Sequence, residues 1–158
     1  MANGVTLLIR IIFVIYKKIV VFGKKMEKKV GRSENISFPE LNISKIKAKV
    51  DTGAYGVALH VDDIKYQDGK LYFKINSKEF IYDKFKTVMV KSSFGGIQKR
   101  FSILTKITIG DSIYKFYVSL TDRKKMRYPV LIGRRFLYKF NYLVDVTKKN
   151  INDTNKKV

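Results

Sequence analysis

The stretch Asp51-Thr52-Gly53 is the part of this chain best suited to acid–base chemistry. A carboxylate held beside a reacting group can take up and release a proton, and a neighbouring glycine lets the backbone turn sharply and approach a ligand closely. Asp-Gly-type sequences are also frequent in ordinary turns. The catalytic interpretation therefore depends on whether the rest of the chain supplies matching parts.

The residues before Asp51 predict the strand that carries it. Ile46, Ala48 and Val50 alternate with lysines, which is the period-two pattern of a half-buried strand. Asp51 follows where this strand ends, so we expect its carboxylate at the mouth of a turn.

The rest of the chain is predicted to consist mainly of short strands. Apolar residues alternate in several runs that are separated by turn residues. The predicted turns and later elements are, in order, Asp68-Gly69, Gly95-Gly96, Gly110-Asp111, a strand at 130–132, a helix at 134–140 and a strand at 143–146. Because at most one helix is expected in the folded part, the pattern predicts a compact all-β barrel or sandwich.

Residues 26–147 are expected to form one domain, which is large enough to bury a core. Residues 1–25 are apolar but interrupted by charges, so no uninterrupted run is long enough to span a bilayer. They fit a basic amphipathic helix on an anionic membrane, a segment packed on the domain, or residues upstream of a start at Met26. Residues 148–158 form a polar tail that we expect to be frayed, together with Thr147.

Composition excludes several kinds of site. The chain has no cysteine, so it has neither a disulfide nor a thiolate nucleophile. Its one histidine, His60, rules out a zinc site with two or more histidines from one chain. No phosphate-binding Gly-x-x-x-x-Gly-Lys loop occurs. We expect no cofactor, no metal and a cytoplasmic location, with membrane association through residues 1–25 as the alternative.

The formal net charge of +20 is far from zero. Such a field attracts polyanions, which include nucleic acid, ribosomes and acidic membrane surfaces. The lysines are scattered along the chain rather than grouped in one block, so an overall compositional bias explains them equally well.

Three stretches, in this order, resemble the signature regions of retropepsins, the single-domain aspartic proteases of the retroviral type. Residues 50–54 (VDTGA) resemble the catalytic loop, residues 93–97 (SFGGI) the glycine-tipped flap, and residues 130–137 (VLIGRRFL) the second signature. The resemblance implies a closed all-β barrel with one short helix near the C-terminus, preceded here by the apolar N-terminal extension.

Over roughly residues 29–147 the chain is more closely similar to a bacterial and archaeal family named ATP-dependent zinc protease. The retropepsin-like domain of that family often occurs beside ATP-grasp glutamate ligases of the ribosomal-modification type. The further matching stretches are 31–34 (GRSE), 47–49 (KAK), 58–60 (ALH), 91–92 (KS), 95–100 (GGIQKR), 120–123 (LTDR) and 144–146 (VDV). The chain departs from the family at Gly56-Val57, where Thr-Ser is usual, and so lacks two hydroxyls near the acid.

The resemblance implies aspartic-type endopeptidase activity on peptide amide bonds. That chemistry needs two carboxylates that share one proton, and this chain has one such motif, so a homodimer would pair two copies of Asp51. Asp122 or Asp145 is the alternative second acid within one chain. The implied site residues are Asp51, Thr52 and Gly53 for catalysis, Ala54, Phe94, Gly95, Gly96 and Ile97 for substrate binding, and Leu131, Ile132, Gly133 and Arg134 for support.

The arginines near these motifs are expected to hold the fold rather than the substrate. Arg134 is predicted to form a structural ion pair, and Arg123 and Arg134 are predicted to pair with Asp122 or Glu34. The expected partners of the protein are a second copy of itself, a peptide or protein substrate, and an ATP-grasp glutamate ligase or a ribosomal component.

Two other functions remain open from the sequence. One is a non-catalytic basic module that binds a ribosome or nucleic acid on the same barrel. The other is a metal-dependent peptidase in which His60 would act with Asp51, Asp62, Asp63 or Asp122, a sparse set of ligands.

Overall fold

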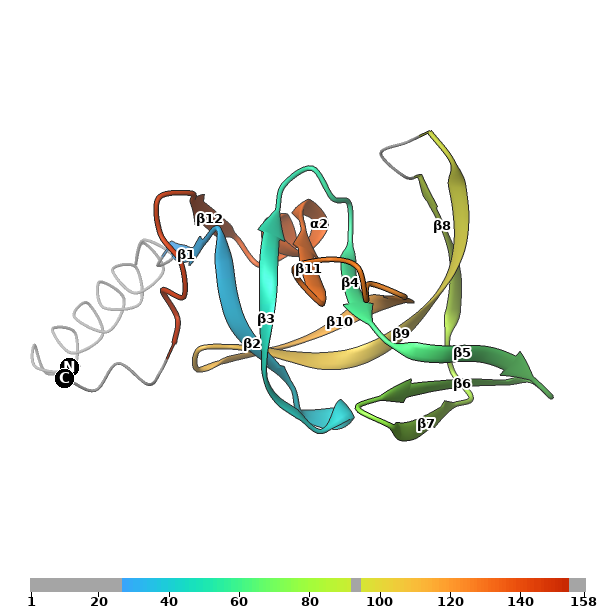
Figure 1. Cartoon of the computed structure of the whole chain (residues 1–158). Coiled ribbons are helices and arrows are strands. Elements are labelled where there is room, and N and C mark those ends of the chain that lie inside the picture. Colours follow the sequence, from blue (N-terminus) through green and yellow to red (C-terminus); the bar gives the residue numbers. More distant parts are fainter. Residues whose placement is uncertain (1–26, 92–94, 154–158) are drawn as a thin grey trace, which may run out of the picture.

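The computed structural model describes residues 27–91 and 95–153, and its elements are almost all strands (Figure 1). In chain order they are β1 (Lys28–Gly31), β2 (Ser33–Phe38), the 3₁₀ turn η1 (Pro39–Leu41), β3 (Ile43–Asp51), β4 (Val57–His60), β5 (Asp62–Gln67), β6 (Lys70–Ile75), β7 (Lys78–Tyr82), β8 (Lys86–Lys91), β9 (Ile97–Ile109), β10 (Ser112–Thr121), β11 (Val130–Gly133), α2 (Arg134–Lys139) and β12 (Tyr142–Asp145).

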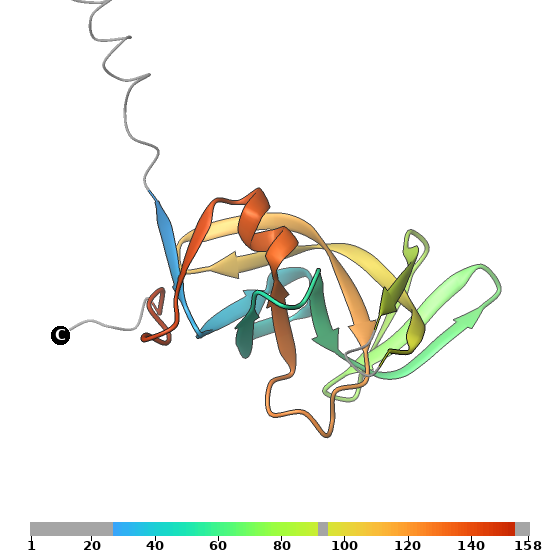
Figure 2. The same ribbon diagram turned by 90° about the horizontal axis from the view of Figure 1, so that it is seen from above.

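The largest sheet closes on itself. Its seven strands follow the order β10-β4-β11-β3-β2-β9-β8, and an additional pairing joins β10 to β9. That pairing connects the ends of a six-stranded ring and leaves β8 as an outer strand on β9 (Figures 1 and 2). The expected closed all-β architecture with one short helix is therefore confirmed.

The core fills the ring because apolar residues alternate along its strands. In β10 the side chains of Tyr114, Phe116 and Val118 are buried, while the residues between them are largely exposed. The helix α2 adds Phe136, which is fully buried and meets Phe116 edge to face at 5.2 Å between ring centroids. Such a pair adds stabilisation beyond the burial of apolar area alone.

A smaller sheet, β5-β6-β7, stands beside the β8–β9 hairpin in both views (Figures 1 and 2). Its first turn has positive φ at Asp68 (50°) and Gly69 (78°), the geometry of a tight two-residue hairpin. Aromatic contacts connect the two regions, since Phe101 of β9 lies 6.2 Å from Tyr66 of β5 by ring centroids. The predicted Asp68-Gly69 hairpin is confirmed.

The segment after β12 is held against the start of the domain by Glu34, whose side chain is completely buried. One Glu34 oxygen accepts the backbone N–H groups of Gly31 (2.6 Å) and Ile151 (3.1 Å), and the other accepts that of Asn152 (3.2 Å). The backbone of Lys148 also accepts a hydrogen bond from Arg32 at 2.8 Å. The expectation of a frayed end is therefore wrong as far as residue 153, because a buried carboxylate binds this segment.

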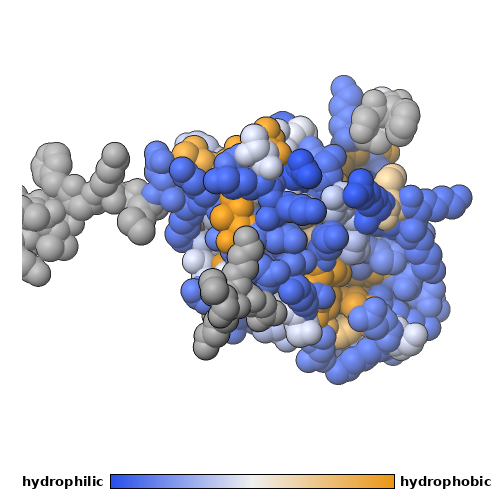
Figure 3. All heavy atoms as spheres, turned by 60° about the vertical axis from the view of Figure 1, so that its left-hand side comes forward, coloured by the Kyte–Doolittle hydropathy of each residue, from blue (hydrophilic) through white to orange (hydrophobic). Residues whose placement is uncertain are grey.

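The expectations for residues 1–25, and for Phe94 in the flap, lie outside the described residues. Within the described ranges, no helix has the length and apolarity needed to cross a bilayer. The face of the molecule shown in Figure 3 is mainly hydrophilic, with smaller hydrophobic areas between the polar side chains.

Candidate active site

Asp51 lies at the end of β3, where an inserted strand fixes the position of the following turn. Strand β11 pairs in parallel with β3, with Gly133 opposite Asp51, and pairs antiparallel with β4 on its other side. Residues 52–56 must therefore pass over the end of β11 to connect β3 with β4 (Figure 1). Because β11 lies between β3 and β4, the turn spans two inter-strand spacings, about 10 Å in all, and stays open around the Asp51 carboxylate.

The turn donates hydrogen bonds to Asp51. Its Oδ1 accepts the backbone N–H groups of Gly53 at 3.1 Å and Ala54 at 3.2 Å. Its Oδ2 forms an ion pair with Lys49 Nζ at 3.3 Å, and the side chain is 26% exposed. The carboxylate is thus oriented through one oxygen, while the other lies toward a lysine at the surface.

These contacts favour the ionised form of Asp51. Burial by itself raises the pKa of the carboxyl, but Lys49 and the amides of Ala54 and Gly53 outweigh it, so the pKa lies below its usual value. Lys49 was not among the residues predicted for the site. Its position two residues before Asp51, on the same face of β3, is the sequence signal that identifies it.

The second signature packs against the turn that follows Asp51. A Cβ at Gly133 would lie 2.7 Å from the Ala54 carbonyl oxygen, so a side chain there would displace the turn. Ile132 is completely buried, and Leu131 pairs with Ala58 of β4.

Arg134 binds the turn in a different way from the predicted ion pair. Its backbone N–H donates to the Ala54 carbonyl at 2.9 Å, and its Nη1 donates to the Gly53 carbonyl at 3.1 Å. Its guanidinium also lies 5.5 Å from the ring centroid of Tyr55, which is 62% exposed. The prediction of a structural ion pair is wrong because the group that Arg134 binds is a backbone carbonyl; Tyr55 was not predicted at all.

Of the predicted substrate-binding residues, Ala54 lies in the turn, while Gly95, Gly96 and Ile97 lie at the tip of the β8–β9 hairpin. Gly95 has φ of +86°, a conformation that glycine adopts without strain. Thr52 is exposed in the turn.

Two arginines with half-buried side chains interact electrostatically, Arg100 from β9 and Arg123 from the loop after β10. Burial lowers the pKa of both; Arg100 lowers that of Arg123 further, and Asp51 opposes the shift. The charge of Arg123 therefore interacts with those of both Arg100 and Asp51. Within residues 27–91 and 95–153, no carboxylate forms an ion pair with either guanidinium.

The predicted pairing of Arg123 and Arg134 with Asp122 or Glu34 is wrong. Arg123 Nε donates to the backbone carbonyl of Tyr128 at 3.0 Å, and Glu34 is occupied by backbone N–H groups. Arg100 Nε donates to Gln98 Oε1 at 2.9 Å.

His60 is engaged with its neighbours and does not fit a zinc site. Its Nδ1 accepts the backbone N–H of Arg123 at 2.9 Å, and its Nε2 lies 3.7 Å from Asp62 Oδ1. In the part of the chain that the structure describes, no three metal-ligating side chains gather. We derive no chemical step through a metal here.

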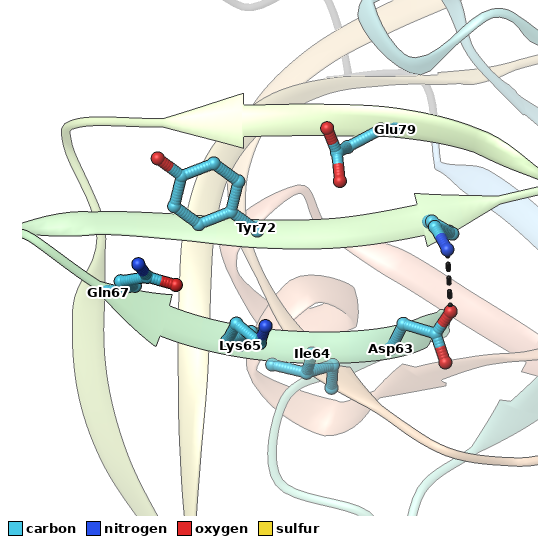
Figure 4. Close-up of a pocket in the computed structure, with 7 residues that line it drawn as sticks. Asp63, Ile64, Lys65, Gln67, Tyr72 and Glu79 are labelled. Atoms are coloured by element: carbon cyan, nitrogen blue, oxygen red, sulfur yellow. Dashed lines mark hydrogen bonds and ion pairs between the residues drawn. The ribbon is translucent and has the colours of Figure 1, made fainter.

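A surface hollow that Asp51 does not line lies on the outer face of β5-β6-β7. It has a volume of about 680 Å³. Lys65, Tyr72 and Glu79 lie along this face, one from each strand (Figure 4). Charges of both signs line it, including the Lys74–Asp63 ion pair at 2.9 Å, so it lacks the single charge sign typical of a polyanion site.

Comparisons with known proteins agree with this geometry. The family model described as retropepsin-like aspartic endopeptidase RimB matches residues 29–155. Two relatives named "Probable alpha-L-glutamate ligase" are 32% identical over 66% of this chain (Shewanella halifaxensis) and 29% identical over 68% of it (Desulfotalea psychrophila). In each case 26% of the relative is covered, so the chain spans about a quarter of their length.

A solved structure has a similar fold. The Legionella pneumophila protein Lpg0085, described as a protein of unknown function, is 29% identical, with a TM-score of 0.62 over 79% of this chain and 98% of that one. The family model matches most of the chain, which forms a strand ring with Asp51 at the end of β3 beside β11. This match shows that the chain belongs to the RimB-like family of retropepsin-like aspartic endopeptidases.

Proposed function

We propose that the chain is one subunit of a homodimeric aspartic peptidase in which two copies of Asp51 form the catalytic pair. The observation that carries the proposal is the Asp51 carboxylate, oriented by the amides of Gly53 and Ala54 where the paired strands β3 and β11 end. One carboxylate is half of the required pair, and a twofold axis beside the turn would supply the other.

In this mechanism an ionised Asp51 takes a proton from water, and the water oxygen attacks the peptide carbonyl carbon. The protonated carboxyl of the partner's Asp51 donates its hydrogen bond to the carbonyl oxygen. A proton then passes to the leaving nitrogen as the C–N bond breaks. Lys49 favours ionisation in the single subunit, whereas a second carboxylate nearby raises one pKa of the pair, which allows one proton to be shared.

We propose an acidic peptide, with glutamate side chains, as the substrate. Arg123 interacts electrostatically with Asp51, but its side chain, like that of Arg100, forms its hydrogen bond with a neutral oxygen in the described part of the chain. Guanidinium groups bind carboxylates with two parallel hydrogen bonds. The net charge of +20 attracts such a substrate. The names of the relatives point the same way, because a glutamate ligase forms the type of bond that this domain would cleave.

The test is hydrolysis of two fluorogenic peptides of equal length, one with four glutamates and one with four glutamines. The wild-type protein is expected to cleave the glutamate peptide, and Asp51→Asn is expected to abolish the cleavage. Asp83→Asn is the matched control, because Asp83 is 76% exposed and its nearest cation is Lys70 at 3.9 Å.

Full activity in Asp51→Asn would contradict the catalytic role of this carboxylate. Equal cleavage of both peptides would contradict the acidic specificity while leaving the peptidase proposal standing.

A further inference from the structure

His60 connects strand β4 to the loop that carries Arg123. The backbone N–H of His60 donates to the Pro129 carbonyl at 2.8 Å, and its ring Nδ1 accepts the Arg123 backbone N–H at 2.9 Å. One residue therefore holds both ends of the loop between β10 and β11. Its side chain is 22% exposed, so protein atoms surround most of the ring.

The loop folds back on itself around Arg123. The Arg123 carbonyl accepts the N–H of Met126 at 2.8 Å, and the Arg123 side chain donates to the Tyr128 carbonyl at 3.0 Å. The backbone and the side chain of Arg123 are thus both bonded within the same short loop. A shift of the Arg123 backbone would therefore move its guanidinium relative to Asp51.

The hydrogen bond from the Arg123 N–H identifies Nδ1 of His60 as the acceptor nitrogen of the ring. An acceptor nitrogen carries no proton, so the ring N–H is on Nε2, which faces Asp62 Oδ1 at 3.7 Å. Asp122 Oδ1 lies 3.6 Å from Nδ1, and Lys124 Nζ neutralises Asp62 at 2.8 Å. Among the described contacts, the His60 ring connects to the Arg123 backbone and not to Asp51.

We propose that His60 is a positioning residue for substrate specificity: its Nδ1 holds the Arg123 backbone so that the guanidinium can bind a carboxylate of the substrate beside Asp51. The inference rests on the acidic substrate proposed above. It adds a residue that touches neither the substrate nor the reacting atoms.

The test measures binding rather than turnover, in the full-length Asp51→Asn protein. Tetraglutamate and tetraglutamine peptides are titrated by calorimetry into this background and into the same background with His60→Leu, His60→Asn or Arg123→Gln. Asparagine places an acceptor oxygen one bond from Cγ, as Nδ1 is in histidine, whereas leucine offers bulk without an acceptor.

His60→Leu is expected to weaken tetraglutamate binding about tenfold, as the loss of one charge-assisted contact would, and to leave tetraglutamine binding unchanged. His60→Asn is expected to restore most of the affinity. In the Arg123→Gln background, His60→Leu is expected to have no further effect, since the group that it positions is absent.

Three results would overturn the inference: unchanged tetraglutamate binding in folded His60→Leu, an equal loss in the Arg123→Gln background, or a background protein that does not prefer tetraglutamate to tetraglutamine. Nitrogen NMR gives a separate readout, because the chain has a single histidine. The Nε2–H tautomer is expected, and the Nδ1–H tautomer would contradict the hydrogen bond.

Failure of the proposed peptidase function would give a different set of results from failure of the inference about His60. A wild-type protein that binds tetraglutamate through Arg123 and His60 but hydrolyses no peptide would remove the catalytic proposal and leave the positioning role of His60 in place.

Discussion

Glu34 and Asp51 are both carboxylates that accept backbone N–H groups, yet they lie in contrasting surroundings. Glu34 is completely buried, and both of its oxygens bind backbone amides. Asp51 is 26% exposed; one oxygen binds two amides, and the other faces Lys49. The same type of hydrogen bond thus closes the fold at Glu34 and orients a reactive group at Asp51.

The difference separates a structural carboxylate from the one that we propose to be catalytic. A buried carboxylate whose oxygens are both hydrogen-bonded has no oxygen left to act on a substrate. Its removal costs the stability that each of those hydrogen bonds contributed. A carboxylate with one oxygen at the surface can bind water or a second carboxylate. Substitutions at the two sites should therefore have opposite effects on stability and on activity.

Asp51→Asn is expected to give the largest effect of all, a fall in kcat of about 1,000-fold or more, because the base is removed. The amide oxygen can still accept the N–H groups of Gly53 and Ala54, so the free energy of unfolding should change by no more than about 1 kcal/mol. Peptide hydrolysis and urea unfolding measure the two quantities. A large loss of stability would place Asp51 in the same class as Glu34.

Glu34→Gln is expected to do the reverse. One of its oxygens becomes an NH₂ group facing backbone donors, which should cost about 2–4 kcal/mol of stability and lower the melting temperature by roughly 5–15 °C. Scanning calorimetry measures this change, and kcat measured well below the transition should stay near that of the wild type.

Glu40→Gln is the matched control for Glu34. Glu40 also accepts a backbone N–H, from Lys106 at 3.1 Å, but its side chain is 37% exposed. A loss of less than about 1 kcal/mol is expected. Equal losses at the two positions would contradict the role given to the burial of Glu34.

Arg134→Met sharpens the comparison, because it loosens the Asp51 turn without touching the carboxylate. The bond from Nη1 to the Gly53 carbonyl, 3.1 Å, is lost, and we expect about a tenfold fall in kcat with about 1 kcal/mol less stability. Arg135→Met is the control, since that guanidinium lies over the same Tyr55 ring at 5.8 Å. Equal effects from both variants would show that the Tyr55 contact, rather than the turn carbonyl, is what matters.

Lys49→Met is expected to have the smallest effect on stability, and one that depends on pH. Because the folded state lowers the pKa of Asp51, the ion pair stabilises the protein above the unfolded pKa of about 3.9 and loses this contribution as the pH falls through the lowered folded value. Both side chains are partly exposed, so the loss at neutral pH should be below about 1 kcal/mol.

Denaturant titrations of the wild type and Lys49→Met between about pH 7 and pH 2 measure this dependence. The two stability curves should approach one another at the acidic end. A constant difference across the range would show that the Asp51 carboxylate is not the group that responds to Lys49.

The sequence predicted the parts of the fold that local pattern controls. Alternation in β3 and β10, and the Asp68-Gly69 turn, follow from side-chain period and backbone preference over a few residues. The position of Asp51 at a strand end was predicted in the same way and is where the structure places it.

Contacts between distant parts of the chain were not predicted. The bonds from Glu34 to Ile151 and Asn152 span more than a hundred residues, and no local pattern marks a glutamate as buried. The electrostatic interaction of Arg123 with Arg100 and Asp51 likewise depends on how β9 and β10 close the ring. Lys49 is different, because its position two residues before Asp51 was visible in the sequence.

Mixing of subunits tests the central claim most directly. Wild-type protein is allowed to exchange subunits with an equal amount of Asp51→Asn, and hydrolysis of the glutamate peptide is measured at fixed total protein concentration. If two copies of Asp51 form one site, only wild-type pairs are active, and the rate should fall to roughly one quarter of that of pure wild type. A rate of one half, as for independent subunits, would contradict the shared catalytic pair.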